Sequence, residues 1–227
     1  MIYSNKPVKL DDSQTHGRGA ELYIVEGDSA ALAVSQARDA TFQAVLPMQG
    51  KPLNAIKATK KKVGENALFT ALTEALGTGM GNSFKLANLR YERVLLLMDP
   101  DADGIHCGAL MLMFFYQWMR PLLDEGHVEL VRAPIGEIVK KQPAATVFAY
   151  SDEQFRTLCE DYRKRGDISF TPLRYRGLAS INPDALQQIC LSPATRNTMP
   201  MGVTDAEMAI EVFSQSNPQL LATPYAQ

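Results

Sequence analysis

Short, unbroken apolar runs give the chain its most regular pattern. Residues 94–98 (V-L-L-L-M) form one such run, and residues 22–25 (L-Y-I-V) form another. Runs of this length without alternation are typical of strands buried on both faces, as at the centre of a parallel sheet. Further short strands are predicted at residues 43–46 and 128–131.

Longer segments, with apolar residues three and four positions apart, predict helices that pack on this sheet. In chain order we expect helices at residues 30–38, 65–75, 105–122, 152–165, 184–190 and 206–214. The expected N-cap residues are Asp28 or Ser29 for the first helix, Ser151 for the fourth, and Thr204 or Asp205 for the last. The alternation of buried strands with helices predicts an α/β fold with a parallel central sheet.

The same pattern divides the chain into four parts. Residues 1–19 are polar without a helical or strand period and are expected to form an N-terminal arm. Residues 20–135 carry the α/β core. Residues 136–216 are expected to form a small C-terminal tail region, with a β-pair at 136–141 and 146–150 and a strand within 166–173. Residues 217–227 are polar, contain two prolines, and are expected to form a flexible tail.

Three aspartates follow directly after the strand predicted at 94–98. Asp99, Asp101 and Asp103 stand at the carboxyl edge of the sheet, where ligand sites of open α/β folds lie. Carboxylates this close repel each other unless a cation lies among them. Aspartate and glycine can also simply turn the chain, but a turn does not need three acids. A calcium-binding EF-hand loop fits less well, because its twelfth position would be Leu110 and no helix precedes it.

Glu26 has the same position at the end of the strand predicted at 22–25. Gly27 then permits a tight turn into a helix. Two such units in one parallel sheet would bring Glu26 near the three aspartates. The alternative is that the acidic residues here only cap the helix.

Composition indicates a globular chain whose nucleic-acid contacts must be local. The 227 residues are 46% hydrophobic and 21% charged, and the net charge is -2. The densest positive patch holds Lys57, Lys60, Lys61 and Lys62. It is either a solvated face or, beside an acidic metal site, a clamp on nucleic-acid phosphates. His106 lies close to the aspartates and either contacts a phosphate or metal-bound water or serves to cap and pack its helix.

Cysteine usage and hydropathy indicate a cytoplasmic protein. The three cysteines are far apart, which favours free thiols in a reducing compartment. We find no signal peptide, and the apolar segment 110–118 is too short to span a bilayer. The stretch G-T-G-M-G at 77–81 lacks the strand and helix context of a nucleotide-binding loop, so no ATPase activity is expected from the chain alone.

Several motifs, in this order, resemble one family. They are E-L-Y-I-V-E-G-D-S-A (21–30), P-M-Q-G-K-P-L-N-A-I-K-A (47–58), A-L-G-T-G-M-G (75–81), L-R-Y-E-R-V-L-L-L-M-D-P-D-A-D-G-I-H (89–106), F-F-Y-Q-W-M (114–119), Y-R-G-L (175–178) and L-S-P-A-T-R (191–196). They are similar to the Toprim portion of the B subunit of bacterial type IIA topoisomerases, the family of DNA gyrase and topoisomerase IV. The resemblance runs from residues 7–13 to about residue 214, nearly the whole chain.

The resemblance implies a Rossmann-like Toprim fold and a role in DNA cleavage and religation. It implies Mg²⁺, with Mn²⁺ as a substitute, held by Glu26, Asp99, Asp101 and Asp103. It implies that Glu26 is the catalytic general acid and base at the ribose 3′-oxygen, and that the metal stabilises charge on the scissile phosphate. The candidate DNA-binding residues are Lys51, Lys57, Lys60, Lys61, Lys62, His106 and Arg176. The implied partners are DNA, an A-type subunit that carries the nucleophilic tyrosine, and a separate ATPase domain or subunit through which ATP would act. The implied location is the nucleoid.

The chain also departs from the family pattern. The ATPase and transducer regions of the family's B-type chain are not present, and Tyr91 is not expected to be a nucleophile because R-Y at this position belongs to the Toprim portion. Residues 31–33 read A-L-A in place of G-G-S, 176–181 read R-G-L-A-S-I in place of K-G-L-G-E-M, and 133–136 read A-P-I-G in place of P-P-L-Y. These departures favour a divergent paralogue or a free-standing Toprim subunit. A truncated form fits the length but fits the substitutions less readily.

Two functions of different kinds therefore remain. The chain is either the metal-binding part of a topoisomerase or a non-catalytic module that binds DNA or an A-type subunit as a regulator. The retained acids favour the first and the altered R-G-L-A-S-I stretch favours the second. A different Toprim enzyme, such as a primase or nuclease, is disfavoured by the gyrase-type motifs outside the acids.

Overall fold

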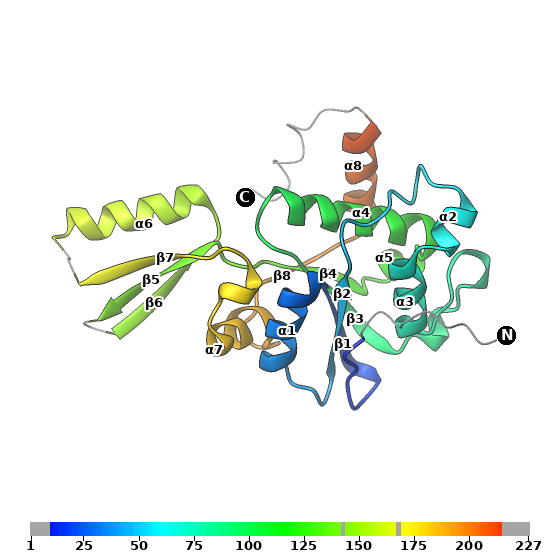
Figure 1. The fold of residues 1–227 in the computed structure, drawn as a ribbon, viewed down its shortest axis with the longest axis horizontal. Helices are drawn as coiled ribbons and strands as arrows, with labels where there is room; N and C mark the ends of the chain where they lie inside the picture. Colours follow the sequence, from blue (N-terminus) through cyan, green and yellow to red (C-terminus); the bar gives the residue numbers. More distant parts are fainter. Residues whose placement is uncertain (1–9, 142–143, 167–168, 215–227) are drawn as a thin grey trace.

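The computed structural model describes residues 10–141, 144–166 and 169–214, and a five-stranded sheet forms the centre of the fold (Figure 1). Its strand order is β2-β1-β3-β4-β8. The strands are β1 (Gly17–Glu26), β2 (Gln43–Met48), β3 (Tyr91–Leu97), β4 (Val128–Val131) and β8 (Thr198–Pro200). The first four run parallel, and β8 pairs antiparallel with β4. The predicted α/β fold with a mainly parallel central sheet is confirmed.

Alternating side chains of the apolar strands build two cores, one on each face of the sheet. In β3, Val94 and Leu96 point into one core and Leu95 and Leu97 into the other. All four are fully buried, as the unbroken apolar run predicts for a central strand. The sheet is thus the middle layer of a three-layer fold.

Helices cover both faces (Figure 1). One core packs against α2, α3, α4, α5 and α8, and the other against α1, α7 and two short helical turns, η3 and η4. Their bounds are α1 (Gly27–Ala37), α2 (Lys60–Gly64), α3 (Ala67–Leu76), α4 (Ala102–Trp118), α5 (Pro121–Asp124), α7 (Pro183–Leu186), η3 (Leu178–Ser180), η4 (Gln187–Leu191) and α8 (Val203–Ser214). Two further short turns are η1 (Gly81–Ser83) and η2 (Leu86–Asn88). No helix within the described ranges is long and apolar enough to cross a membrane.

Several helix ends differ from the sequence-based expectation, and three of them change a predicted cap or stop. Helix α1 starts directly after β1, so Glu26 is its N-cap and neither Asp28 nor Ser29 fills that position. Helix α4 ends at Trp118, because Pro121 has no N–H to continue the hydrogen-bond ladder and starts the separate helix α5. Helix α8 begins at Val203, ahead of both expected caps.

Two of the expected cap residues still bond at helix starts. The Asp205 side chain of α8 accepts the backbone N–H of Gly202 at 2.8 Å. The expected cap of α6 (Asp152–Lys164) is confirmed, because Ser151 Oγ accepts the N–H of Gln154 at 3.1 Å.

A second, smaller sheet projects from the core on the left of Figure 1. Its strand order is β6-β5-β7, all antiparallel, with α6 packed along it. The strands are β5 (Gly136–Lys141), β6 (Ala144–Ala149) and β7 (Phe170–Arg174), so the expected β-pair is present. The two ends of this projecting module lie side by side, since Gly136 pairs with Arg174 and the N–H of Tyr175 bonds to Ile135 O at 2.9 Å.

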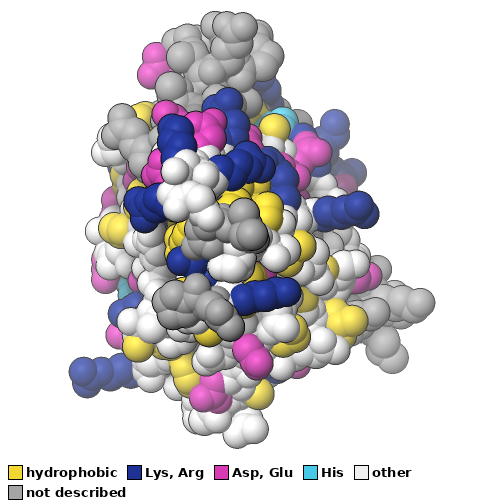
Figure 2. Space-filling view, turned by 90° about the vertical axis from the view of Figure 1, so that its left-hand side faces the viewer, with side chains coloured by type: hydrophobic (Ala, Val, Ile, Leu, Met, Phe, Trp, Pro, Cys, Tyr) yellow, Lys and Arg dark blue, Asp and Glu magenta, His cyan; other side chains and the backbone are white. Residues whose placement is uncertain are grey.

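The side of the molecule from which the module projects carries charges of both signs. Figure 2 looks onto this side and shows lysine and arginine side chains interspersed with aspartate and glutamate. Helix α6 contributes to both kinds, with acidic residues in its first turn and basic residues in its last. The projecting module therefore also carries cationic side chains that a polyanion could contact. An experiment that assigns DNA binding to the lysines of α2 needs a control on this module.

After this projecting module the chain returns to the core. The segment η3–α7–η4 packs beside α1, and β8 completes the edge of the central sheet. Residues 136–216, expected as one tail region, therefore supply both the projecting module and part of the core; the domain boundaries remain predictions. The expected arm at 1–19 is described only from residue 10, and its last three residues begin β1. The tail expected at 217–227 lies outside the described residues.

A polar cluster at the opposite end of β3 from the acids ties the N-terminal segment to the sheet. Asp12 accepts hydrogen bonds from Tyr91 Oη and Arg90 Nη2, both at 2.5 Å, and lies 3.0 Å from His16 Nε2. Burial raises the pKa of Asp12. The hydrogen bonds from Tyr91, His16, Arg90 and the N–H of Ser13 outweigh this effect and bring the pKa to well below its ordinary value.

This cluster predicts a loss of stability in acid. Because the folded-state pKa of Asp12 is depressed, its contribution is present above the unfolded pKa of about 4 and is lost as the pH falls below it. We expect the free energy of unfolding to fall less steeply in this range for Asp12→Asn than for the wild type. Urea titrations at pH values from about 5 to about 2.5 would measure this. Parallel curves for the two proteins would contradict it.

Candidate functional site

Glu26 and Asp99 meet at the carboxyl edge of the central sheet. Strands β1 and β3 are parallel neighbours, with Val25 opposite Leu97, so the residues that follow each strand emerge together. The backbone N–H of Asp99 donates to Glu26 Oε1 at 3.2 Å. This is the juxtaposition that the two similar strand–turn–helix units predict.

The acids line a cavity of about 480 Å³. Its walls come from the turn after β1, the loop after β2 and the start of α4. The lining residues are Glu26, Gly27, Asp28, Ser29, Met48, Gly50, Lys51, Asp99, Asp103 and Cys107. Four carboxylates and a single ammonium group therefore face one hollow, which is an environment for a cation.

Asp99 is held in place by the loop that leads into η3. The N–H of Leu178 donates to Asp99 Oδ1 at 2.8 Å. The preceding Gly177 has φ +142°, and a Cβ there would lie 2.8 Å from Asp99 Oδ2. Both the backbone conformation and the close approach therefore require glycine. Sequence reasoning used R-G-L only as a motif and missed this contact, whose one local signal was an isolated glycine.

Asp101 and Asp103 have different surroundings. Asp101 is the N-cap of α4, and its Oδ1 accepts the N–H of Gly104 at 2.8 Å. Asp103 is exposed, and its Oδ1 lies 3.1 Å from Lys51 Nζ. A Cβ on Gly104 would lie 2.0 Å from Asp99 O and 2.6 Å from Glu26 Oε1, so only glycine lets α4 start this close to the acids.

Burial and the repulsion of neighbouring carboxylates shift Glu26 and Asp99 toward their protonated forms. Burial, followed by the charge of Asp99 and more weakly those of Asp101 and Asp103, raises the pKa of Glu26 to about 7, against a backbone hydrogen bond that lowers it. Burial also raises the pKa of Asp99, which the bond from Leu178 partly offsets. A carboxyl group that titrates near neutral pH suits proton transfer.

The donor set fits a hard divalent cation. Carboxylate oxygens are the ligands that Mg²⁺ and Mn²⁺ prefer, and the Lys51 ammonium group already stands among them as a cation. Within the described part of the chain, no three His, Cys, Asp or Glu side chains are arranged to hold a metal as they stand. Asp101 Oδ1 accepts the N–H of Gly104 and Asp103 Oδ1 pairs with Lys51, so a metal would bind their other oxygens or displace these partners.

The candidate DNA-binding residues fall into two groups. Lys51 lines the acid cavity, and exposed Arg176 precedes the Gly177 that touches Asp99. Lys60, Lys61 and Lys62 are exposed on α2. The other two candidates contact the end of α8 through Phe213. Lys57 Nζ donates to its carbonyl oxygen at 3.3 Å, and the ring of His106 lies 4.8 Å from its ring.

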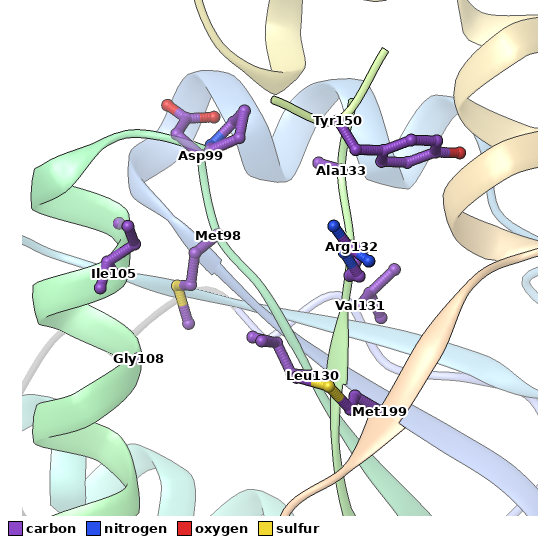
Figure 3. A pocket seen from close by; sticks show the side chains of 12 residues that line it. Met98, Asp99, Ile105, Gly108, Leu130, Val131, Arg132, Ala133, Tyr150 and Met199 are labelled. Atoms are coloured by element: carbon purple, nitrogen blue, oxygen red, sulfur yellow. The ribbon is translucent and has the colours of Figure 1, made fainter. Parts of the chain in front are cut away.

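A second, smaller cavity of about 120 Å³ lies between α4 and β4 (Figure 3). Met98, Ile105 and Leu130 give it an apolar wall, and Arg132 lies over the ring of Tyr150 at 5.6 Å. Asp99 borders both cavities. Asp99, in the turn after β3, therefore lies between the two cavities.

A mainly parallel sheet with acids at the ends of two neighbouring strands is the arrangement of the Toprim class. The Toprim domain family matches residues 21–133, and this part of the chain belongs to that family.

Nearly the whole chain is also similar to the B subunit of DNA gyrase. It is 39% identical to that of Thermotoga maritima over 209 residues, which are 91% of this chain and 32% of the relative. It is 37% identical to that of Archaeoglobus fulgidus over 214 residues, 94% of this chain and 33% of the relative. It is 39% identical to the novobiocin-resistant form from Streptomyces niveus over 213 residues, which are 92% of this chain and 31% of the relative. The chain therefore spans about a third of the length of these relatives, and the resemblance to the Toprim portion of the gyrase B chain is confirmed.

Proposed function

We propose that this chain is the magnesium-binding Toprim module of a type II DNA topoisomerase. It would contribute the metal site and a general acid and base to DNA cleavage and religation by a tyrosine-bearing partner subunit, in the cytoplasm. The observation that carries the proposal is the meeting of Glu26 and Asp99 in one acidic cavity, with the pKa of Glu26 raised to about 7. ATP would act through a separate domain or subunit.

In this proposal Glu26 moves the proton. When the partner's deprotonated tyrosine attacks the phosphorus, the bond from phosphorus to the 3′-oxygen breaks and protonated Glu26 gives its proton to that oxygen. In religation the 3′-hydroxyl attacks, Glu26 takes the proton back, and the tyrosine leaves deprotonated. Asp99, held by the N–H of Leu178, and Asp103 offer oxygens to the metal. Bound Mg²⁺ would stabilise charge on the scissile phosphate and the 3′-oxygen.

The sequence changes near Gly177 do not remove these contacts. In R-G-L-A-S-I, the residues that reach Asp99 are Gly177 and Leu178, and both match the family motif. The substituted Ala179 and Ser180 are exposed. This supports a cleavage-competent module over the alternative, a divergent non-catalytic module that binds DNA or an A-type subunit as a regulator.

The test is reconstitution with an A-type subunit from the same genome, together with the B-type ATPase region if a separate gene encodes it. We expect a covalent protein–DNA complex that forms with Mg²⁺ and is absent with a chelator. Failure to form the complex, while this chain still binds the A-type subunit and DNA, would favour the regulatory module instead.

DNA binding by the chain alone should depend on the lysines of α2. With about four phosphates neutralised, the slope of log affinity against log salt is expected near about −4. Changing Lys60, Lys61 and Lys62 to alanine should flatten this slope by about 2 to 3. Anisotropy of a labelled duplex between about 50 and 200 mM salt measures it.

The matched control removes three cationic residues from the end of α6 in the projecting module: Arg163, Lys164 and Arg165. The control variant should keep the wild-type slope. If the control flattens the slope and the α2 variant does not, the DNA lies on the projecting module.

A further inference from the structure

We propose that Lys51 is an internal counter-ion that couples metal binding to DNA binding. In the metal-free protein its ammonium group pairs with Asp103 and competes with the metal. A bound metal would displace it toward a DNA phosphate. This inference rests on the proposed function and goes beyond a simple role of Lys51 in holding DNA.

The position of Lys51 carries the inference. It lies in the loop after β2, between Gly50 and Pro52, and its Nζ is 3.1 Å from Asp103 Oδ1. Both residues line the cavity that Glu26 and Asp99 also line. The ammonium group therefore pairs with one acid of the cavity that Glu26 and Asp99 share.

No other lysine or arginine among the described residues lines this cavity. Other candidate lysines have different contacts: Lys57 Nζ donates to Phe213 O, and Lys61 Nζ lies 3.9 Å from Glu65 Oε1. The charge of Lys51 also contributes to lowering the pKa of His106, after burial, at the first turns of α4. Lys51 is thus the one lysine or arginine of the described structure that lines the acid cavity.

The ion pair between Lys51 and Asp103 can be separated easily, so that each residue can take another partner. The side chain of Lys51 is 44% exposed and that of Asp103 is 81% exposed, so water screens the pair and separating it costs little. A divalent cation on Asp99 and Asp103 would repel the ammonium group, and a phosphate at the mouth of the cavity would attract it. Metal and DNA would then favour each other's binding by the same factor.

The test measures Mn²⁺ affinity by electron paramagnetic resonance, with and without an uncleavable DNA duplex, on the intact chain. Without DNA, Lys51→Met should bind Mn²⁺ about fivefold more tightly than the wild type. DNA should tighten Mn²⁺ binding to the wild type by a similar factor and should have much less effect on Lys51→Met.

Two controls separate a direct contact from a general charge effect. Lys85→Met removes the same charge from an exposed lysine that does not line the cavity and is not a candidate DNA-binding residue, and it should leave Mn²⁺ affinity unchanged with and without DNA. In an Asp103→Asn background, Lys51→Met should lose most of its effect, as a double-mutant cycle reports for residues in contact.

The outcomes distinguish this inference from the function it rests on. If Mn²⁺ binds the wild type and Asp99→Asn abolishes this binding, but Lys51→Met behaves like Lys85→Met, Lys51 is not the counter-ion and the proposed function stands. If Mn²⁺ binds neither the wild type nor Lys51→Met, both proposals fail.

Discussion

Replacing Glu26 by glutamine should slow DNA cleavage and religation by the reconstituted complex about 10²- to 10⁴-fold, the usual contribution of a positioned acid or base. Glutamine keeps the size of the side chain and an oxygen that can accept the N–H of Asp99. It cannot deliver or take up a proton. The loss should therefore fall on the rate of the chemical step, measured as single-turnover formation and reversal of the covalent complex, with little change in DNA affinity.

A neighbouring acid provides the matched control. Asp28 lines the same cavity but has no proposed role in proton transfer, so Asp28→Asn should retain most of the activity. Equal losses in the two variants would mean that the cavity needs negative charge in general and that Glu26 is not the proton donor. Wild-type rates for Glu26→Gln would remove it from the mechanism altogether.

Replacing Arg196 by methionine should lower the free energy of unfolding by about 3–5 kcal/mol, the usual cost of leaving a buried charge without its partner. The side chains of Arg196 and Glu21 are 2% and 4% exposed. The two guanidinium nitrogens Nη1 and Nη2 bond to Glu21 Oε2 and Oε1, each at 2.6 Å, and Nη1 also lies 2.8 Å from the hydroxyl of Tyr23. Arg196 thus joins the segment after η4 to β1. Its loss leaves the buried Glu21 carboxylate without its cationic partner.

Urea denaturation measures this effect, and two further variants identify its cause. Arg174→Met breaks an ion pair with Asp152 whose side chains are both more than half exposed, so it should cost less than about 1 kcal/mol. Adding Glu21→Leu to Arg196→Met removes the unpaired charge and should recover much of the loss. A double variant as unstable as Arg196→Met alone would show that lost packing, and not the stranded charge, is the cause.

The sequence predicted what depends on local pattern. Apolar runs identified β1, β2, β3 and β4, because a strand buried on both faces has no polar alternation. The same reasoning placed Glu26 and Asp99 at one edge, since the ends of parallel strands share it. Strand β8 was missed because its three residues, T-M-P, are too few to show a period and end in proline.

What the sequence could not predict are the contacts between distant segments. The Leu178–Asp99 bond joins residues 79 positions apart, and the Arg196–Glu21 pair joins residues 175 positions apart. The pairing of Lys51 with Asp103 spans 52 positions. Nothing in the local sequence links these partners, because only the assembled sheet and its loops bring them together.

The paired ends of the projecting module have an evolutionary consequence. The chain leaves the core at Ile135 and re-enters it at Tyr175, and these two residues are joined by a backbone hydrogen bond. A segment whose two ends touch can be lengthened, shortened or exchanged without moving its attachment points. Descendants of this chain could therefore remodel the 39 residues between them, 136–174. The spacing of Glu26 and Asp99 would be unaffected, so this module is where we expect related proteins to differ most in size while keeping the same chemistry.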